Sequence, residues 1–269
     1  MEHDDEIEGR LLSRRQALHL VRGTALVLAT GGKGRPANAA LFAPPVPLIA
    51  TPAATQGPFF VDENLHRSDL TIGSDRPAIA QAVPFKLDLT VYTIGLDGSR
   101  MPLPQAQVDL WHVDALGVYS DEPQGLNPEN TQGERWLRGF QRTDAHGRVG
   151  FQTVFPGWYR GRTTHIHFKI RYLRDGKQPA SFTSQFFLPD TLADQIYQRS
   201  PYRSRPEREM RNQRDMVYRG TLRDGTRVGE LLTLRPQPLA SGAGYAAQYT
   251  IAFLTHPHPS NGGHKRSLG

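Results

Sequence analysis

The sequence predicts an all-β protein: a β-sandwich with short helical segments and long loops. Two runs, residues 85–91 and 108–111, alternate apolar and polar side chains as half-buried strands do. Turn signals separate such runs at 97–98, 144–147 and 175–176. The 26 glycines and 21 prolines among 269 residues suit many short strands joined by turns. A chain of this length can fold as one sandwich.

The first 40 residues have the features of a twin-arginine export signal. An arginine pair at 14–15 precedes a short apolar stretch at 24–30 and the small residues Ala-Asn-Ala at 37–39. We therefore expect residues 1–40 to be a signal and tail, and the protein to be periplasmic or extracellular. Arg22 interrupts the apolar stretch. The alternative is a disordered tail with a chance arginine pair on a cytoplasmic protein.

One domain is expected after this signal. Residues 41–54 are rich in proline and alanine, which predicts an extended linker along the surface. Residues 55–255 hold the strand patterns of the sandwich, and 256–269 are expected to be a disordered tail. The last elements expected within the domain are helices at 190–198 and 205–216 and a strand at 244–254.

Charge and composition exclude several classes of function. The net charge of +6 comes from 32 basic and 26 acidic residues that are interspersed, so we expect no nucleic-acid binding. No apolar run reaches the roughly 18 residues that a membrane-spanning helix needs. The absence of cysteine removes thiolate ligands and, with them, zinc-finger and other soft-metal sites.

Two histidines lie two positions apart at the start of a strand-like run. Because successive side chains of a strand point to opposite faces, His165 and His167 share one face and Ile166 and Phe168 the other. One strand can therefore offer two imidazoles to a single metal ion. The simpler interpretation is two half-buried polar residues with no metal.

Two tyrosines accompany this pair. A Pro-Gly turn at 156–157 returns Trp158 and Tyr159 towards the histidines, and the strand pattern after residue 107 runs through a glycine turn to Tyr119. Phenolate is a hard, anionic oxygen ligand, so it favours trivalent iron over Zn²⁺ or Cu(I).

Three motifs in order carry a family resemblance. They are W-H-x-D-A-x-G-x-Y-S at 111–120, D-x-x-G-x-x-x-F-x-T-x-x-P-G-W-Y at 144–159 and G-R-x-x-H-I-H-F-K at 161–169. This order resembles the intradiol ring-cleavage dioxygenases, the group that contains protocatechuate 3,4-dioxygenase and catechol 1,2-dioxygenase. T-Q-G-P-F-F at 55–60 is similar to the segment that leads into the family's catalytic domain, and S-Q-F-F at 184–187 to the strand that supplies its glutamine.

The resemblance implies a non-haem Fe(III) centre. Its ligands fall on Tyr119, Tyr159, His165 and His167. In the family one tyrosinate, here Tyr159, leaves the metal and accepts a proton while the other stays bound. The implied reaction joins O₂ to an aromatic vicinal diol between its two hydroxyl-bearing carbons. It gives a cis,cis-muconate-type diacid without an external reductant.

Other residues take subsidiary roles under this resemblance. Arg162 is expected to stabilise anionic character on the substrate, and Gln185 to orient groups around the ligands. Pocket candidates are Trp158, Asp114 and Phe60. We expect a structural role for His112 and surface positions for His66 and His146.

The chain departs from the named enzymes in two ways. The segment between Tyr159 and His165 is shorter, so the substrate cannot be carried over from them. No long helical region like the dimerisation domain of catechol 1,2-dioxygenases is expected, so the chain is similar to compact, exported members. The oligomeric state stays open, a homodimer included.

Two other classes of function also fit the histidine pair. One is a Zn²⁺ or Fe(II) hydrolase or oxygenase in which a carboxylate such as Asp114 joins His165 and His167. The other is a β-sandwich binding module without a metal. Both leave the two tyrosines without a role.

Overall fold

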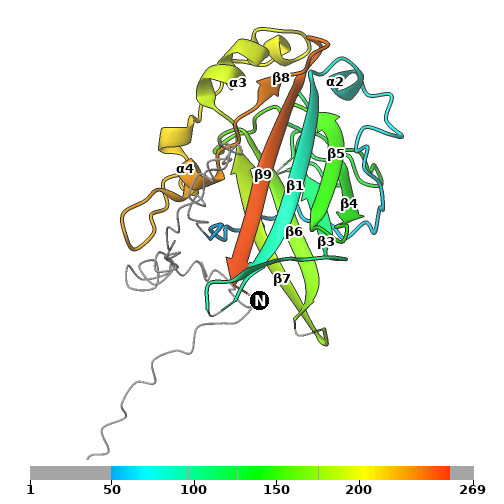
Figure 1. Ribbon diagram of the computed structural model, residues 1–269. Helices are drawn as coiled ribbons and strands as arrows, with labels where there is room; N and C mark the ends of the chain where they lie inside the picture. The colour runs from blue at the N-terminus through cyan, green and yellow to red at the C-terminus, as the bar shows by residue number, and fades with distance from the viewer. Residues whose placement is uncertain (1–49, 96, 126, 175, 255–269) are drawn as a thin grey trace, which may run out of the picture.

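The computed structural model describes residues 50–95, 97–125, 127–174 and 176–254. Two β-sheets pack face to face within these ranges, so the predicted all-β sandwich is confirmed (Figure 1). The expected export signal at 1–40 and the expected tail at 256–269 lie outside the described residues.

The first sheet has five strands, and β1 lies at its centre. Its path is β2-β1-β9-β8, and β5 also pairs with β1. The bounds are β1 (Pro84–Ile94), β2 (Arg100–Pro102), β5 (Arg148–Val154), β8 (Gln237–Pro238) and β9 (Tyr245–Leu254). β1 runs parallel to β9 and antiparallel to β2 and β5. The strand predicted at 244–254 is therefore confirmed as β9.

The second sheet has four antiparallel strands in the order β4-β3-β6-β7. The bounds are β3 (Gln107–Trp111), β4 (Arg138–Arg142), β6 (His165–Arg174) and β7 (Gln178–Phe187). The histidine-bearing strand β6 is central, between β3 and β7. It therefore holds its residues by ladder bonds on both sides.

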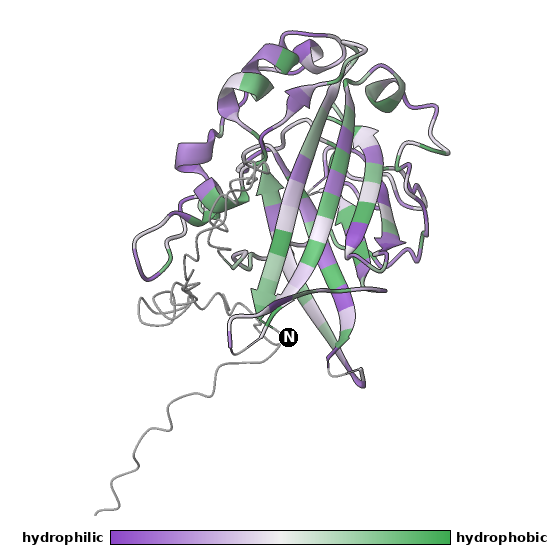
Figure 2. Cartoon of the chain, in the orientation of Figure 1, coloured by the Kyte–Doolittle hydropathy of each residue, from purple (hydrophilic) through white to green (hydrophobic). Residues whose placement is uncertain are grey.

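Alternating side chains build the core between the sheets. Leu87 and Leu89 of β1 and Ile166 and Phe168 of β6 belong to one buried cluster. Hydrophobic and hydrophilic bands alternate along β1, β5 and β9 in Figure 2, as strands with one buried face require. The other members of each strand, among them His165 and His167, therefore point to the outer faces.

Short helices join the strands. They are α2 (Pro77–Ala80), α3 (Asp190–Tyr197) and α4 (Val228–Leu232), with 3₁₀ turns η1 (Tyr202–Ser204) and η2 (Asn212–Arg214). The first predicted helix is confirmed as α3, which buries Ala193 and Ile196. None of the helices in the described ranges is long and apolar enough to cross a bilayer.

The helix predicted at 205–216 is wrong. Only the turn η2 forms there, because polar side chains of this segment bond to distant parts of the chain. Arg208 pairs with Asp194 of α3, and the side-chain amide of Asn212 donates to the carbonyl of Leu188. Such tertiary bonds override a weak local preference for helix.

The chain before β1 covers the outer face of the four-stranded sheet. The backbone N–H of Ala54 donates to Thr183 of β7, and that of Arg67 donates to Phe140 of β4. The described end of the stretch at 41–54 does not lie on the surface as expected, since Thr51 and Pro52 are buried. Thr51 donates its N–H to Ala252 of β9, which draws the chain against the sheets.

Candidate metal centre

Strand β6 brings two imidazoles together. His165 and His167 share the outer face, and their Nε2 atoms lie 3.0 Å apart. Both side chains are buried, and the Trp111 ring stacks on His167 with centroids 4.8 Å apart. The Nδ1 of His165 lies 2.6 Å from the carbonyl of Thr163, so this nitrogen carries the proton and donates it there. The Nε2 of His165 is then a lone-pair donor.

Burial keeps both imidazoles neutral. It lowers the pKa of His165 to about 3, with the charge of Arg162 as the second cause. It lowers the pKa of His167 well below the ordinary value, and the neighbouring His165 adds to the shift. Neutral imidazole is the form that binds metal ions.

Two loops supply the tyrosines. Tyr119 follows β3 and Tyr159 follows β5, and the loops lock together through glycines. A Cβ on Gly117, at φ +78°, would lie 2.0 Å from the carbonyl oxygen of Trp158. A Cβ on Gly157 would lie 2.5 Å from the carbonyl oxygen of Ala115. Only glycine permits this approach, which sets the two phenol rings 5.5 Å apart between centroids.

The phenols converge on the histidines. The Tyr159 hydroxyl lies 3.3 Å from Nε2 of His165. The Tyr119 hydroxyl is buried and has no hydrogen-bond partner, and neither has Nδ1 of His167. Burial raises the pKa of both phenols, that of Tyr119 well above its ordinary value, with Tyr159 as the next cause. A buried polar atom without a partner is costly, and a cation among these four groups would remove the cost for the Tyr119 oxygen.

The donor set suits trivalent iron. Two neutral imidazoles and two ionisable phenols combine borderline nitrogen ligands with hard oxygen ligands, which is the set expected for Fe(III) rather than Cu(I). Among the described residues, no group of three or more His, Cys, Asp or Glu side chains surrounds one point. Within that part of the chain, the two phenols are the groups that could complete a site with the histidine pair.

Arg162 lies beside the ligand set in a fixed orientation. Its Nε donates to Asp215 at 2.7 Å and its Nη2 to the side-chain oxygen of Gln185 at 2.6 Å. Gln185 lies opposite His167 in the ladder of β6 and β7, and its amide donates to the carbonyl of Thr55. The guanidinium is thus tied to β7 on one side and to the segment after α3 on the other.

Comparison with known proteins decides the family. The model of a protein family described as Dioxygenase matches residues 56–198, more than half of the chain. The chain belongs to the intradiol ring-cleavage dioxygenases. The intradiol ring-cleavage dioxygenase from Tetranychus urticae has 26% identity and a TM-score of 0.60, over 79% of this chain and 97% of that one.

Two further relatives are more distant. The dioxygenase domain of a dioxygenase carbohydrate-binding protein fusion from Streptomyces sp. SirexAA-E shares the fold, with 23% identity and a TM-score of 0.50, over 76% of this chain and 97% of that one. Catechol 1,2-dioxygenase of Acinetobacter baylyi is 28% identical over 113 residues, 41% of this chain. The match spans 32% of that relative, about a third of its length.

The predicted pocket residues lie in different places. Phe60 packs on Trp111, with centroids 4.9 Å apart, and lies under the ammonium of Lys169. The Trp158 ring lies against the guanidinium of Arg205, 4.4 Å from its centroid. Phe60 therefore packs against residues of β3 and β6, and Trp158 against the residue that follows η1.

Asp114 is a structural residue. Its carboxylate accepts hydrogen bonds from Leu116, Val118 and Arg76, which fixes the turn that leads to Tyr119. Its side chain is fully buried, and burial, opposed by these bonds, raises its pKa. The alternative of a two-histidine, one-carboxylate site that uses Asp114 is wrong for this structure, because no carboxylate of the described residues forms a metal-binding group with the two histidines.

The other three histidines of the described residues lie as expected. His112 is buried and bonds to Val113 and Thr153, whereas His66 and His146 are exposed.

Three neighbours of the ligands were not predicted. The Phe59 ring stacks on Tyr119 with centroids 4.2 Å apart. Arg138 of β4 donates to the carbonyls of Phe59 and Ser120, and its guanidinium carbon lies 5.9 Å from the centroid of the Tyr119 ring. Asp215 holds Arg162. Alternation along the segment at 55–60 was the available signal for Phe59, because residues of opposite parity face opposite ways in an extended chain.

Proposed function

We propose that this protein is a non-haem Fe(III) dioxygenase that cleaves a catechol-type aromatic between its two hydroxyl-bearing carbons. O₂ is the second substrate, and a cis,cis-muconate-type diacid is the product. One observation carries the proposal: two imidazole Nε2 atoms 3.0 Å apart meet one buried and one partly buried phenol, with a fixed guanidinium beside them. Membership of the intradiol family supports it.

The two tyrosines differ in freedom, which assigns their roles. Tyr119 is fully enclosed, at 2% exposure, between the Phe59 ring and Arg138. Tyr159 is only partly buried, and its hydroxyl lies 3.3 Å from Nε2 of His165. Tyr159 is thus the phenol that can turn away when a substrate arrives and take a proton from a substrate hydroxyl. Tyr119 stays in place throughout.

Arg162 supplies positive charge where the substrate becomes anionic. Two of its three nitrogens are bound by Asp215 and Gln185, so the guanidinium cannot rotate and needs no reorganisation during the reaction. A ferric ion, when bound, draws electron density from the aromatic diolate so that a ring carbon reacts with O₂. The substrate supplies all the electrons, and we expect no external reductant to be needed.

The test uses the iron-loaded protein and a panel of catechols under ¹⁸O₂ without reductant. Mass spectrometry should find a muconate-type diacid carrying two labelled oxygen atoms. A yellow semialdehyde, or a need for a reduced cosubstrate, would overturn the proposal.

Colour separates the proposed enzyme from the other classes. Charge transfer from tyrosinate to Fe(III) should make the purified protein burgundy. A zinc enzyme, a ferrous enzyme or a metal-free binding module would lack this visible absorption band.

Export also remains a proposal, since it rests on the sequence alone. Residues 1–40 fused to a reporter should direct it out of the cytoplasm, and replacing the arginine pair at 14–15 by lysine should stop this. A reporter that stays in the cytoplasm although the arginine pair is intact would contradict the export proposal.

A further inference from the structure

The segment after α3 contributes one carboxylate, that of Asp215, which bonds to Arg162 beside the candidate metal centre. Asp215 is at 0% exposure and lies outside the residues that the family model matches. Its Oδ2 accepts from Nε of Arg162 at 2.7 Å and from the N–H of Thr163 at 3.0 Å. Its Oδ1 accepts from the N–H groups of Val217 and Tyr218. Both oxygens are thus occupied, which leaves this carboxylate no free lone pair for a substrate or a metal.

The effect of these bonds falls on the guanidinium. Asp215 accepts a hydrogen bond from Nε of Arg162, and Gln185 accepts one from Nη2. An arginine has five N–H donors in one plane, so two fixed nitrogens set the direction of the third. The third nitrogen, Nη1, bonds to neither Asp215 nor Gln185 and is the one through which the guanidinium can meet an anion. The Arg162 side chain keeps 14% of its surface exposed while Asp215 keeps none, so the arginine is within reach from outside and the carboxylate that holds it is not.

We infer that Asp215 is a positioning residue: it turns Arg162 so that the free edge of the guanidinium meets the oxygen anion of the aromatic substrate. This inference rests on the proposed function. It makes the segment after α3 part of the reaction's machinery, although that segment lies beyond the family match. The rival explanation is that Asp215 only holds the turn at 215–218 together.

The chain offers a matched control for that rival. Asp194 of α3 binds Arg208 and Arg211 of the same segment but makes no bond to Arg162. Asp194→Asn therefore makes the same chemical change and loosens the same segment without touching the guanidinium. Asp215→Asn keeps an oxygen for the turn but loses the charge that makes the bond to Arg162 strong.

The experiment compares Asp215→Asn, Asp194→Asn, Arg162→Lys and the double variant Asp215→Asn/Arg162→Lys. Iron content, visible spectrum, thermal midpoint, kcat, KM and the dissociation constant of 4-nitrocatechol are measured for each. We expect Asp215→Asn to keep iron and colour while kcat/KM falls about 10- to 100-fold. In the Arg162→Lys background the same change should cost less than about twofold, because Asp215 acts through that arginine. Asp194→Asn should keep wild-type kinetics.

Asp215→Ser is a second variant in case the asparagine does not fold. Its hydroxyl can still accept from the turn but does not reach Arg162. It should show the same loss and the same absence of further loss with Arg162→Lys.

Two results would overturn the inference: wild-type kcat/KM in a folded Asp215 variant, or an undiminished additional loss in the Arg162→Lys background. A wild type that binds 4-nitrocatechol but cleaves no catechol would contradict the proposed function alone. The coupling between the Asp215 and Arg162 substitutions is then measured from the dissociation constants of 4-nitrocatechol. A wild type that neither binds nor cleaves sinks both.

Discussion

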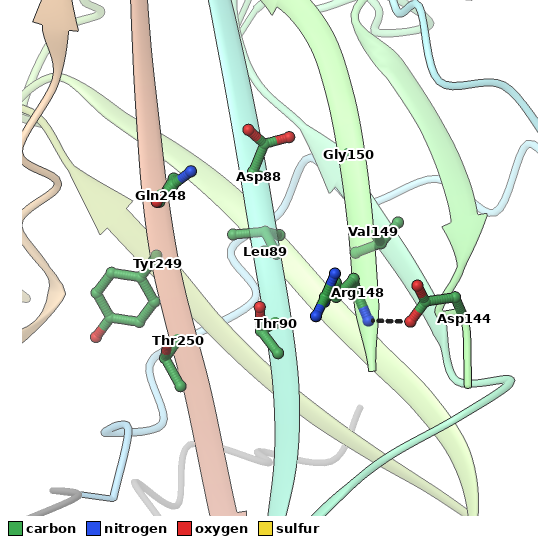
Figure 3. Close-up of a pocket in the computed structure, with 10 residues that line it drawn as sticks. All are labelled: Asp88, Leu89, Thr90, Asp144, Arg148, Val149, Gly150, Gln248, Tyr249 and Thr250. Atoms are coloured by element: carbon green, nitrogen blue, oxygen red, sulfur yellow. Dashed lines mark hydrogen bonds between the residues drawn. The ribbon is translucent and has the colours of Figure 1, made fainter. Parts of the chain in front are cut away.

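The outer faces of the two sheets carry similar patterns and meet different surroundings. On β6 of the four-stranded sheet, alternate positions hold His165 and His167, buried under the chain before β1 and the tyrosine loops. On the five-stranded sheet, Asp88 of β1 and its neighbour Gln248 of β9 stand at the polar positions of their strands. Both line a hollow open to solvent (Figure 3). Polar alternation alone therefore does not mark a functional face. The two faces differ in that chain segments cover one of them and leave the other open.

Cover changes the chemistry of polar groups. Away from water, each polar atom needs a partner, and a group without one is costly. On the covered face Gln185 meets this need twice, through Arg162 and Thr55. The Tyr119 hydroxyl does not meet it. On the open face the side chains of Asp88 and Gln248 are exposed, so water can supply their hydrogen bonds and no comparable demand for a ligand arises.

The largest expected effect is on the covered face, at Tyr119. Tyr119→Phe removes the phenol that, in the proposed function, stays bound to iron throughout, so the variant should retain little iron, lose most of its visible absorption and lose turnover. The iron-free variant should be at least as stable as the iron-free wild type, because the deleted hydroxyl has no partner to lose. Iron analysis, spectra and thermal melts with and without iron measure these effects.

A matched hydroxyl deletion on the other sheet serves as the control. Tyr249 of β9 donates its hydroxyl to the carbonyl of Leu231. Tyr249→Phe should lower the free energy of unfolding by about 0.5–1.5 kcal/mol and leave iron and colour intact. Unchanged iron content and spectrum in Tyr119→Phe would contradict the ligand assignment.

The next effect separates two neighbouring rings. Phe59 is buried and stacks on Tyr119, whereas Phe60 is partly buried and packs on Trp111. Phe59→Ala should cost about 3–5 kcal/mol in the free energy of unfolding and broaden the visible band, because the phenol loses its support. Phe60→Ala should cost less and leave the band unchanged. Equal shifts of the band in both variants would mean that the stack does not orient Tyr119.

A smaller effect is expected at Arg162. Arg162→Lys keeps a positive charge but loses the planar fork that binds Asp215 and Gln185 together. The variant should fold, hold iron and keep its colour, while turnover falls about 10- to 100-fold. Steady-state kinetics with matched spectra measure this. Wild-type turnover would mean that the guanidinium does not act on the substrate.

Local pattern was enough to predict much of the covered face. Strand alternation placed His165 and His167 together and gave the sandwich, because both follow from the period of the strand. The motif order gave Tyr119 and Tyr159, which lie on loops where no period applies. Family resemblance was needed for them, since loop positions depend on contacts such as that of Gly117 with the Trp158 backbone.

Long-range partners escaped prediction for a physical reason. Asp215 meets Arg162 across 53 residues, and Arg138 meets Phe59 across 79. No local period links such pairs. The wrong helix at 205–216 has the same origin, because side chains that suit a helix surface bond to α3 and to the segment before β6 instead. The structural role of Asp114 was missed because its place five residues before Tyr119 does not reveal that its carboxylate accepts the N–H groups of the turn between them.

The smallest expected effect tests the open face with the same residue type. Gln248 on β9 is exposed in the hollow of Figure 3, whereas Gln185 on β7 is fully buried and bonded to Arg162 and Thr55. Gln248→Ala should change the free energy of unfolding by less than about 0.5 kcal/mol and leave iron, colour and turnover as in the wild type. Gln185→Ala should lower turnover and stability together, since it leaves buried groups without partners. Denaturant melts and kinetics on both variants measure the contrast. A loss of turnover in Gln248→Ala would show that the open face takes part in the reaction, and would break the distinction between the two faces.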